Sequence, residues 1–138
     1  MHHHITVRDL ESVIKGHEEE KAAVLDAVQA GMHPIPSKLL RRDDGCAFGQ
    51  WIREAPESLA DYHRIAIPQL RKLHHDFHFT ASCVVASIES RNTALALSLI
   101  NGEFRAQSDM FIEALHDWRI ETKIHTGCFD SFPVTEMG

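Results

Sequence analysis

Apolar side chains recur along the first 30 residues at the spacing of one helix face. Positions three and four residues apart lie on the same side of an α-helix. The positions that follow this rhythm are Leu10, Ile14, His17, Lys21, Val24 and Val28. The pattern predicts a helix over residues 5–30, which Thr6 or Asp9 caps at its start and Gly31 ends.

Prolines and glycines interrupt the next part of the chain. Residues 31–45 are predicted to connect two helices and to form one helical turn at Ser37–Arg42. A short helix is predicted over Ala47–Glu54, and Pro56 is expected to open another helix at its first turn. Pro68 predicts a kink or a new start, because proline lacks a backbone N–H and clashes with the preceding turn. The helix that Pro56 opens carries Leu59, Tyr62 and Ile65 before it meets Pro68.

Residues 69–89 and 93–124 carry the clearest helical patterns, with a turn rich in capping residues at Ser90–Thr93. Gly102 is expected to weaken the second of these helices locally. Inward positions in the first are Leu70, His74, His78, Ala81, Val85 and Ile88. Inward positions in the second are Leu97, Ile100, Phe104, Phe111, Leu115 and Trp118.

No segment alternates apolar and polar residues as a strand does. Long amphipathic helices joined by short turns predict an all-α fold, an antiparallel four-helix bundle with a short extra helix at Ala47–Glu54. We expect one domain over residues 5–125, followed by a tail or linker at 126–138.

Composition narrows the possible functions. The chain has 138 residues, 43% of them hydrophobic and 25% charged, which suits one globular domain. The net charge of −6 argues against a nucleic-acid partner. No apolar run reaches the roughly 18 residues of a membrane span, and the N-terminus lacks the apolar stretch of a signal peptide. Three cysteines far apart are typical of reduced thiols, so we expect a cytoplasmic protein.

Eleven histidines are many for this length, and three of them occupy inward positions. On one helix, His74 and His78 are four residues apart, which places both imidazoles within reach of one metal ion. His17 on another helix can add a third nitrogen. Cys46 stands beside a predicted helix start, where a thiolate is favoured. Three nitrogens and one sulfur form a tetrahedral set that suits Zn²⁺.

Other interpretations of these residues stay open. A single buried histidine is more often a hydrogen-bonded core residue than a metal ligand. His75 and His78, three residues apart, form a second geometrically possible pair. Four histidines without such alignment are expected at the surface or in ordinary polar contacts: His33, His63, His116 and His125. Cys83 is expected in the core, Cys128 has no assigned role, and His2–His4 are left out of the site.

The segment Cys46-Ala-Phe-Gly-Gln-Trp51 resembles the C-x-F-G-x-W signature of the chemoreceptor zinc-binding (CZB) domain family. That family has a first-helix histidine about thirty residues before the cysteine, and here His17 lies 29 residues before Cys46. It also has an H-x-x-x-H pair a little under thirty residues after, and here the pair begins at His74, 28 residues after Cys46. The match covers about residues 8–125.

The resemblance implies a cytoplasmic, homodimeric four-helix bundle that holds one zinc per protomer through His17, Cys46, His74 and His78. Such domains regulate bacterial chemoreceptors and diguanylate cyclases, and this chain is most similar to the cyclase-linked type, in which a GGDEF domain follows. We therefore expect either part of a longer protein or a stand-alone domain. The charged stretch His17–Lys21 departs from the family, which often carries an aromatic residue there; Glu18, Glu20 or Lys21 is expected either beside the ligands or in solvent.

Several functions remain in competition. The main prediction is a zinc-responsive regulatory domain, and an oxidant sensor acting through Cys46 is the first alternative. An enzyme is not expected, because four protein ligands leave no open metal position. A di-iron site needs two Glu-x-x-His elements, and only Glu113–His116 fits. A metal-free helical interaction domain is the last alternative. A dimer is favoured by apolar residues on more than one face of the last helix: Leu95, Leu99, Met110 and Ile112.

Overall fold

The computed structural model describes residues 5–55 and 61–126, apart from the side chains of Asp61 and Tyr62. Six helices make up this part of the chain: α1 (Val7–Ala30), α2 (Ser37–Leu40), α3 (Ala47–Glu54), α4 (Asp61–Glu89), α5 (Thr93–Asn101) and α6 (Glu103–Thr126). The described residues contain no strand. The predicted all-α bundle is therefore confirmed, as is the short extra helix over Ala47–Glu54.

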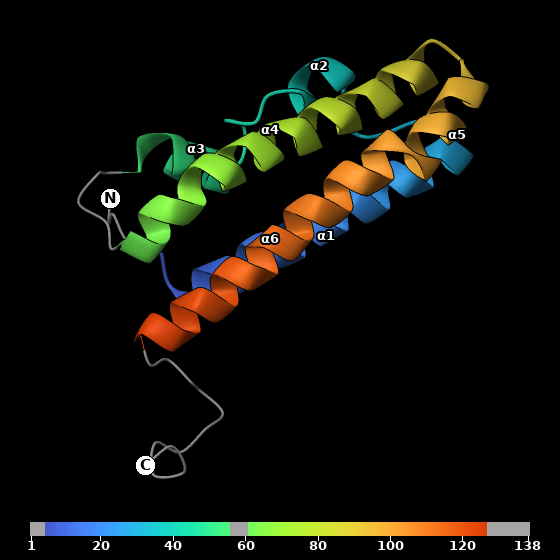
Figure 1. Ribbon diagram of the computed structural model, residues 1–138. Coiled ribbons are helices and arrows are strands. Elements are labelled where there is room, and N and C mark those ends of the chain that lie inside the picture. Colours follow the sequence, from blue (N-terminus) through green and yellow to red (C-terminus); the bar gives the residue numbers. More distant parts are fainter. Residues whose placement is uncertain (1–4, 56–60, 127–138) are drawn as a thin grey trace.

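The long helices α1, α4 and α6 lie side by side along the length of the molecule (Figure 1). After α1, the chain turns back along α4 through α2 and α3, and it reaches the end of the bundle where α1 began. The chain then runs forward in α4 and returns in α5 and α6. This order of directions places α3 against α4 near the start of α1, where segments distant in sequence can share a site.

Both ends of α1 are fixed by the residues that the sequence indicates. Thr6 accepts a hydrogen bond from the backbone N–H of Asp9, and the Asp9 carboxylate accepts one from the N–H of Thr6. At the other end, Gly31 has a φ of 76°, which glycine adopts without strain, and its N–H bonds to the carbonyl of Ala27. Of the predicted inward positions, Lys21 is instead partly exposed and pairs with Asp109.

The helix α4 continues through Pro68, so the predicted new start at this residue is wrong. Pro68 lies on the exposed side of the helix, where a proline disturbs no core packing. Ile65, which precedes Pro68 by three residues, is 78% exposed. The buried side of this turn is formed by His63 and Ile67. The predicted helix start at Pro56 and the side chains of Leu59 and Tyr62 lie outside the described residues.

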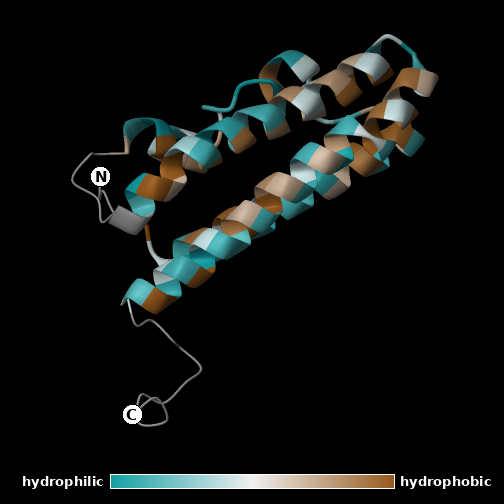
Figure 2. Cartoon of the chain, viewed as in Figure 1, coloured by the Kyte–Doolittle hydropathy of each residue, from teal (hydrophilic) through white to brown (hydrophobic). Residues whose placement is uncertain are grey.

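The predicted C-terminal helix is divided at Gly102 into α5 and α6, which is a larger effect than the local weakening expected. Leu97 is 44% exposed, against the prediction, and Ala96 takes the buried position, four residues before Ile100 and eight before Phe104. Most residues of α5 are hydrophobic or of intermediate hydropathy, which Figure 2 shows in brown and pale colours. The last helix ends at Thr126, and residues 127–138 lie outside the described part of the chain.

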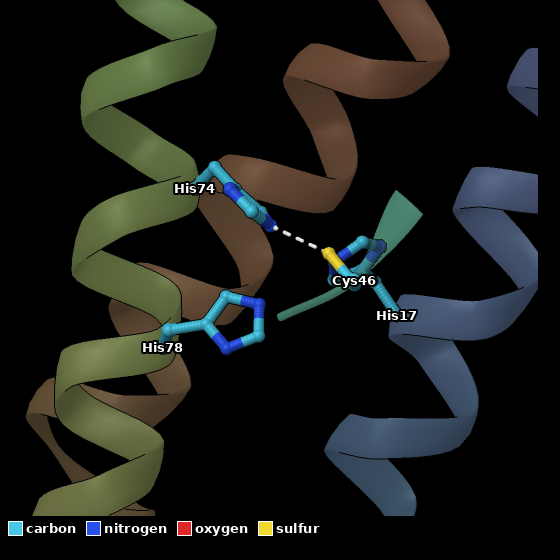
Figure 3. Close-up of side chains that lie close together, drawn as sticks. All are labelled: His17, Cys46, His74 and His78. Atoms are coloured by element: carbon cyan, nitrogen blue, oxygen red, sulfur yellow. Dashed lines mark hydrogen bonds between the residues drawn. The ribbon is translucent and has the colours of Figure 1, made fainter. Parts of the chain in front are cut away.

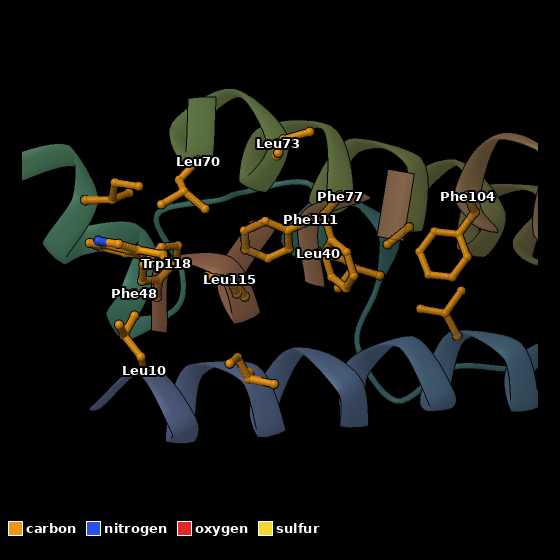
Figure 4. Packing of buried hydrophobic residues seen from close by; sticks show 14 of the residues in the cluster. Leu10, Leu40, Phe48, Leu70, Leu73, Phe77, Phe104, Phe111, Leu115 and Trp118 are labelled. Carbon is orange, nitrogen blue, oxygen red and sulfur yellow. The ribbon is translucent and has the colours of Figure 1, made fainter. Parts of the chain in front are cut away.

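Large apolar side chains from all the long helices meet in one core (Figure 4). Its centre is aromatic: the rings of Phe77 and Phe111 lie 5.6 Å apart between centroids, and those of Phe77 and Phe104 lie 5.9 Å apart. Phe48 joins this core from α3 and lies 6.1 Å from Phe111. Phe48 is 4% exposed, and this ring holds the short helix that carries the cysteine motif in the core.

Candidate metal centre

All four residues predicted as metal ligands come together at one place in the bundle (Figure 3). His17 extends from α1, Cys46 is the residue that caps the start of α3, and His74 and His78 extend from adjacent turns of α4. One ligand atom of each lies within 4.8 Å of the others. A tetrahedral zinc site holds such atoms roughly 3.3–3.8 Å apart. A contraction of about 1 Å would therefore bring the set to that geometry.

One contact in the cluster already has the separation of a tetrahedral site. The sulfur of Cys46 and Nε2 of His74 are 3.4 Å apart (Figure 3). The rings of His74 and His78 lie 4.5 Å apart between centroids, and that of His17 lies 5.2 Å from His74. The three imidazoles and the thiol thus surround a common point, and the residues fit a metal ion bound by three nitrogens and one sulfur.

Backbone carbonyls orient two of the imidazoles. Nδ1 of His17 donates to the carbonyl of Val13 at 2.9 Å, and Nδ1 of His78 donates to the carbonyl of Leu40 at 2.9 Å. A carbonyl only accepts, so each ring carries its proton on Nδ1 and presents the lone pair of Nε2. Nε2 of His78 is buried and has no hydrogen-bond partner. Such an atom is costly unless something other than the protein binds it.

Aromatic rings enclose the cluster. The ring of Phe111 lies 5.0 Å from that of His17 and 5.3 Å from that of His74. Phe77 lies 5.4 Å from His17, and Phe48 lies 5.1 Å from His74. These walls exclude water from most sides of the site, which strengthens electrostatic interactions inside it.

Cys46 is positioned by the start of α3. Its sulfur accepts a hydrogen bond from the backbone N–H of Gly49 at 3.4 Å, as capping residues do. Gly49 itself has no room for a side chain: a Cβ there would lie 1.6 Å from the carbonyl oxygen of Asp43 and 3.0 Å from Cε1 of His74. Glycine at this position thus allows α3 to approach the Asp43 backbone and His74 closely, next to Cys46.

Burial controls the protonation of all four side chains. Burial lowers the pKa of His17 to about 4. Burial also lowers the pKa values of His74 and His78, and the neighbouring histidines add to this lowering. All three rings are therefore neutral at pH 7, as metal binding requires. Burial raises the pKa of the Cys46 thiol. A bound cation reverses this effect, because it stabilises the thiolate.

His75 does not belong to the cluster, so the alternative pair of His75 and His78 is wrong. Its side chain is 59% exposed, and Nδ1 lies 3.3 Å from the carboxylate of Asp43. The charged residues after His17 also contact other groups: Glu18 approaches His116, Glu20 binds His33, and Lys21 pairs with Asp109.

The carbonyls that orient the ligands were not predicted. Val13 lies four residues before His17, a spacing at which a histidine can reach the helix carbonyl, so helical geometry offered a signal. The carbonyl of Leu40 lies 38 positions away from His78 and had no sequence signal.

The remaining histidines make ordinary polar contacts, as predicted. His63 is buried and accepts a hydrogen bond from the indole N–H of Trp118 at 3.0 Å. His33 lies 3.0 Å from Glu20, and His125 lies 3.1 Å from Glu121. Within residues 5–55 and 61–126, no other group of three or more histidine, cysteine, aspartate or glutamate side chains has the geometry of a metal site.

These observations define the class of protein as an all-α bundle with a potential metal site of three histidines and one cysteine. No family model matches the chain, and neither a curated protein nor a solved structure matches it. The resemblance to the CZB family thus depends on the motif and its spacing. None of the helices in the described ranges combines the length and apolar character needed to cross a membrane.

Proposed function

We propose that this chain is a zinc-binding regulatory domain of bacterial signalling, of the CZB type. The observation that supports it best is the convergence of His17, Cys46, His74 and His78, with Nε2 of His78 buried and unpartnered. Ligand chemistry favours zinc, because one thiolate with three imidazoles suits a borderline-soft ion without geometric preference. A site with four protein ligands is closed, which favours a regulatory role over catalysis.

Regulation would follow from how the ligands are distributed in the fold. The four residues belong to α1, to the turn before α3 and to α4. The metal supplies a bond to each of them, so the loaded domain holds these three elements together more tightly than the free domain. A sensor can transmit only such a difference in free energy between two states.

Zinc content and affinity test the proposal. Equilibrium dialysis followed by metal analysis should find about one zinc per chain, measured with His2–His4 replaced by alanine so that they bind no metal. His78→Ala should lower the affinity about a hundredfold or more. His75→Ala is the matched control, since His75 is adjacent in sequence but outside the cluster. A chain without zinc would contradict the proposal and leave a metal-free interaction domain. Full affinity in His78→Ala would contradict the proposed ligand set.

Oxidant sensing is a second candidate, favoured by the partial exposure of Cys46. Attack of the Cys46 thiolate on hydrogen peroxide breaks the O–O bond and gives a sulfenic acid and hydroxide, which removes one ligand. Zinc release by peroxide at low molar excess, abolished in Cys46→Ser, would support this function. Zinc retention under the same treatment would exclude it.

We further propose a cytoplasmic homodimer whose output is a GGDEF diguanylate cyclase or a chemoreceptor. The apolar surface of the C-terminal helices supports dimerisation: Leu95 is 46% exposed and Met110 is 51% exposed. Size-exclusion chromatography with light scattering should give twice the mass of the chain. A monomer at micromolar concentration would contradict the dimer without affecting the zinc proposal.

A further inference from the structure

An open groove of about 310 Å³ lies beside the metal cluster along α1. Three of the four cluster residues line it, namely His17, Cys46 and His78. The fourth, His74, is only 1% exposed and lies behind them. Aromatic rings cover other sides of the cluster, so the groove offers a path from solvent to the ligand atoms.

Gly16 lies in the wall of this groove, in the interior of a 24-residue helix. Glycine weakens a helix interior relative to alanine, so a local reason for it is expected. Its backbone has no positive φ, and a Cβ at this position would meet no atom within 4 Å. Neither a turn nor close packing therefore requires glycine here. The absence of a side chain at Gly16 instead leaves space on this side of the groove.

Glu20 lies one turn further along the same wall. Its side chain is 20% exposed, and its carboxylate lies 3.0 Å from Nε2 of His33. A carboxylate beside a groove raises the local concentration of cations, which speeds their association. The neighbouring Glu19 is exposed and does not line the groove, so it provides a comparison.

We infer that this groove is the port through which metal ions and thiol reagents reach the cluster, with Gly16 keeping it open and Glu20 drawing divalent cations to it. The inference rests on the proposed function in one respect, because it takes the cluster as the place where the metal binds. It adds that access is controlled by two residues that are not ligands.

Metal exchange tests the role of Gly16. In Gly16→Leu, transfer of zinc to excess EDTA and uptake of zinc should both slow about fivefold or more, while the equilibrium affinity stays within about twofold. Gly16→Ala adds only one methyl group and should slow exchange less than Gly16→Leu does. Ala22→Leu is the control for added bulk on an exposed position of α1 and should exchange zinc at the original rate. Unchanged exchange in Gly16→Leu would overturn the inference.

Alkylation of Cys46 in the metal-free protein gives a readout that does not need zinc. Iodoacetamide modification, located by peptide mass spectrometry, should slow in Gly16→Leu and stay unchanged in Ala22→Leu. If the chain binds no zinc but alkylation slows, the proposed function fails and the port stands. If zinc binds and neither rate changes, the port fails alone. Ser12→Phe, at another residue of the groove, repeats the test if Gly16→Leu does not fold.

The rate of zinc uptake, measured at low and at high salt concentration, tests the role of Glu20. Glu20→Gln should slow zinc uptake about two- to fivefold at low ionic strength, and the difference should disappear in about 0.5 M salt. Zinc release should not change. Glu19→Gln is the matched control for the loss of one charge and should leave uptake unaffected. An equal effect in both variants would show general electrostatics instead of a port.

Discussion

Within the described residues, buried histidines occur in two places, and they differ in what satisfies their ring nitrogens. His63 is 4% exposed, and its Nδ1 accepts the indole N–H of Trp118. His78 is 7% exposed, and it donates from Nδ1 to Leu40 while its Nε2 has no partner. Their degree of burial is nearly equal, so burial does not separate a structural histidine from a ligand.

The difference lies in how the hydrogen bonding is completed. His63 is part of a pair that the protein supplies by itself, and a buried pair of this kind stabilises the core. In the cluster, His17 and His78 are each oriented by a carbonyl through Nδ1 and present Nε2 to the same point. Without a further ligand at that point, Nε2 of His78 stays buried and unpartnered, which costs stability. The following experiments compare substitutions in the metal cluster with substitutions in the pair of His63 and Trp118.

Metal removal should have the largest effect. Zinc at about a thousand times its dissociation constant should stabilise the fold by about 4 kcal/mol, because only the folded chain presents the four ligands together. The melting temperature should therefore fall by roughly 10 °C or more on addition of EDTA. The shift should vanish in His17→Ala and persist in His63→Phe, as followed by circular dichroism. Equal melting temperatures with and without zinc would remove the distinction between the two places.

A side chain at Gly49 should have the next largest effect. Gly49→Ala places a Cβ 1.6 Å from the carbonyl oxygen of Asp43, so α3 must move away from α4. The expected cost is about 2–3 kcal/mol of unfolding free energy in the metal-free protein, measured in urea. Zinc affinity should also fall, since Cys46 moves with α3. Gly16→Ala is the control, because its Cβ meets no neighbouring atom; comparable losses in both variants would contradict this account.

Acid should destabilise the metal-free protein through the cluster. The folded-state pKa of His17 is lowered from 6.5 to about 4, so the unfolded chain binds more protons between these values. Stability is thus fully present above about pH 6.5 and is lost as the pH falls towards 4. Between pH 7 and pH 5, His17 alone should contribute a loss of about 2 kcal/mol. Urea unfolding of His17→Leu at both pH values should show a smaller loss than the original chain.

Local spacing was enough to predict much of this site, because its elements are helical. The positions of His74 and His78 on one face of α4 follow from the helix period, and the capping of α1 follows from Thr6 and Asp9. The family resemblance supported the grouping of Cys46 with these histidines, because helix periodicity does not relate residues that lie in different helices.

What escaped prediction depends on contacts between distant segments. The exposure of Leu97 escaped prediction because Ala96 and Leu97 both fit the helix period with Ile100, and only packing against the other helices selects between them. The continuation of α4 through Pro68, which lies on the exposed side of the helix, was also not predicted. The carbonyl of Leu40 became a partner of His78 only because α2 packs against α4.

The smallest effect is expected at the structural histidine. His63→Phe keeps the ring volume but leaves the indole N–H of Trp118 buried without its partner, which should cost about 1 kcal/mol of unfolding free energy. The emission of Trp118 should change with its surroundings, while zinc affinity should stay within about twofold of the original. His78→Phe, the matched change in the cluster, removes the unpartnered Nε2 but also leaves the carbonyl of Leu40 without its donor, so the metal-free fold should lose about as much stability as in His63→Phe, while zinc affinity should collapse. If both substitutions lowered zinc affinity equally, then hydrogen-bond completion would not distinguish a ligand from a structural histidine in this fold.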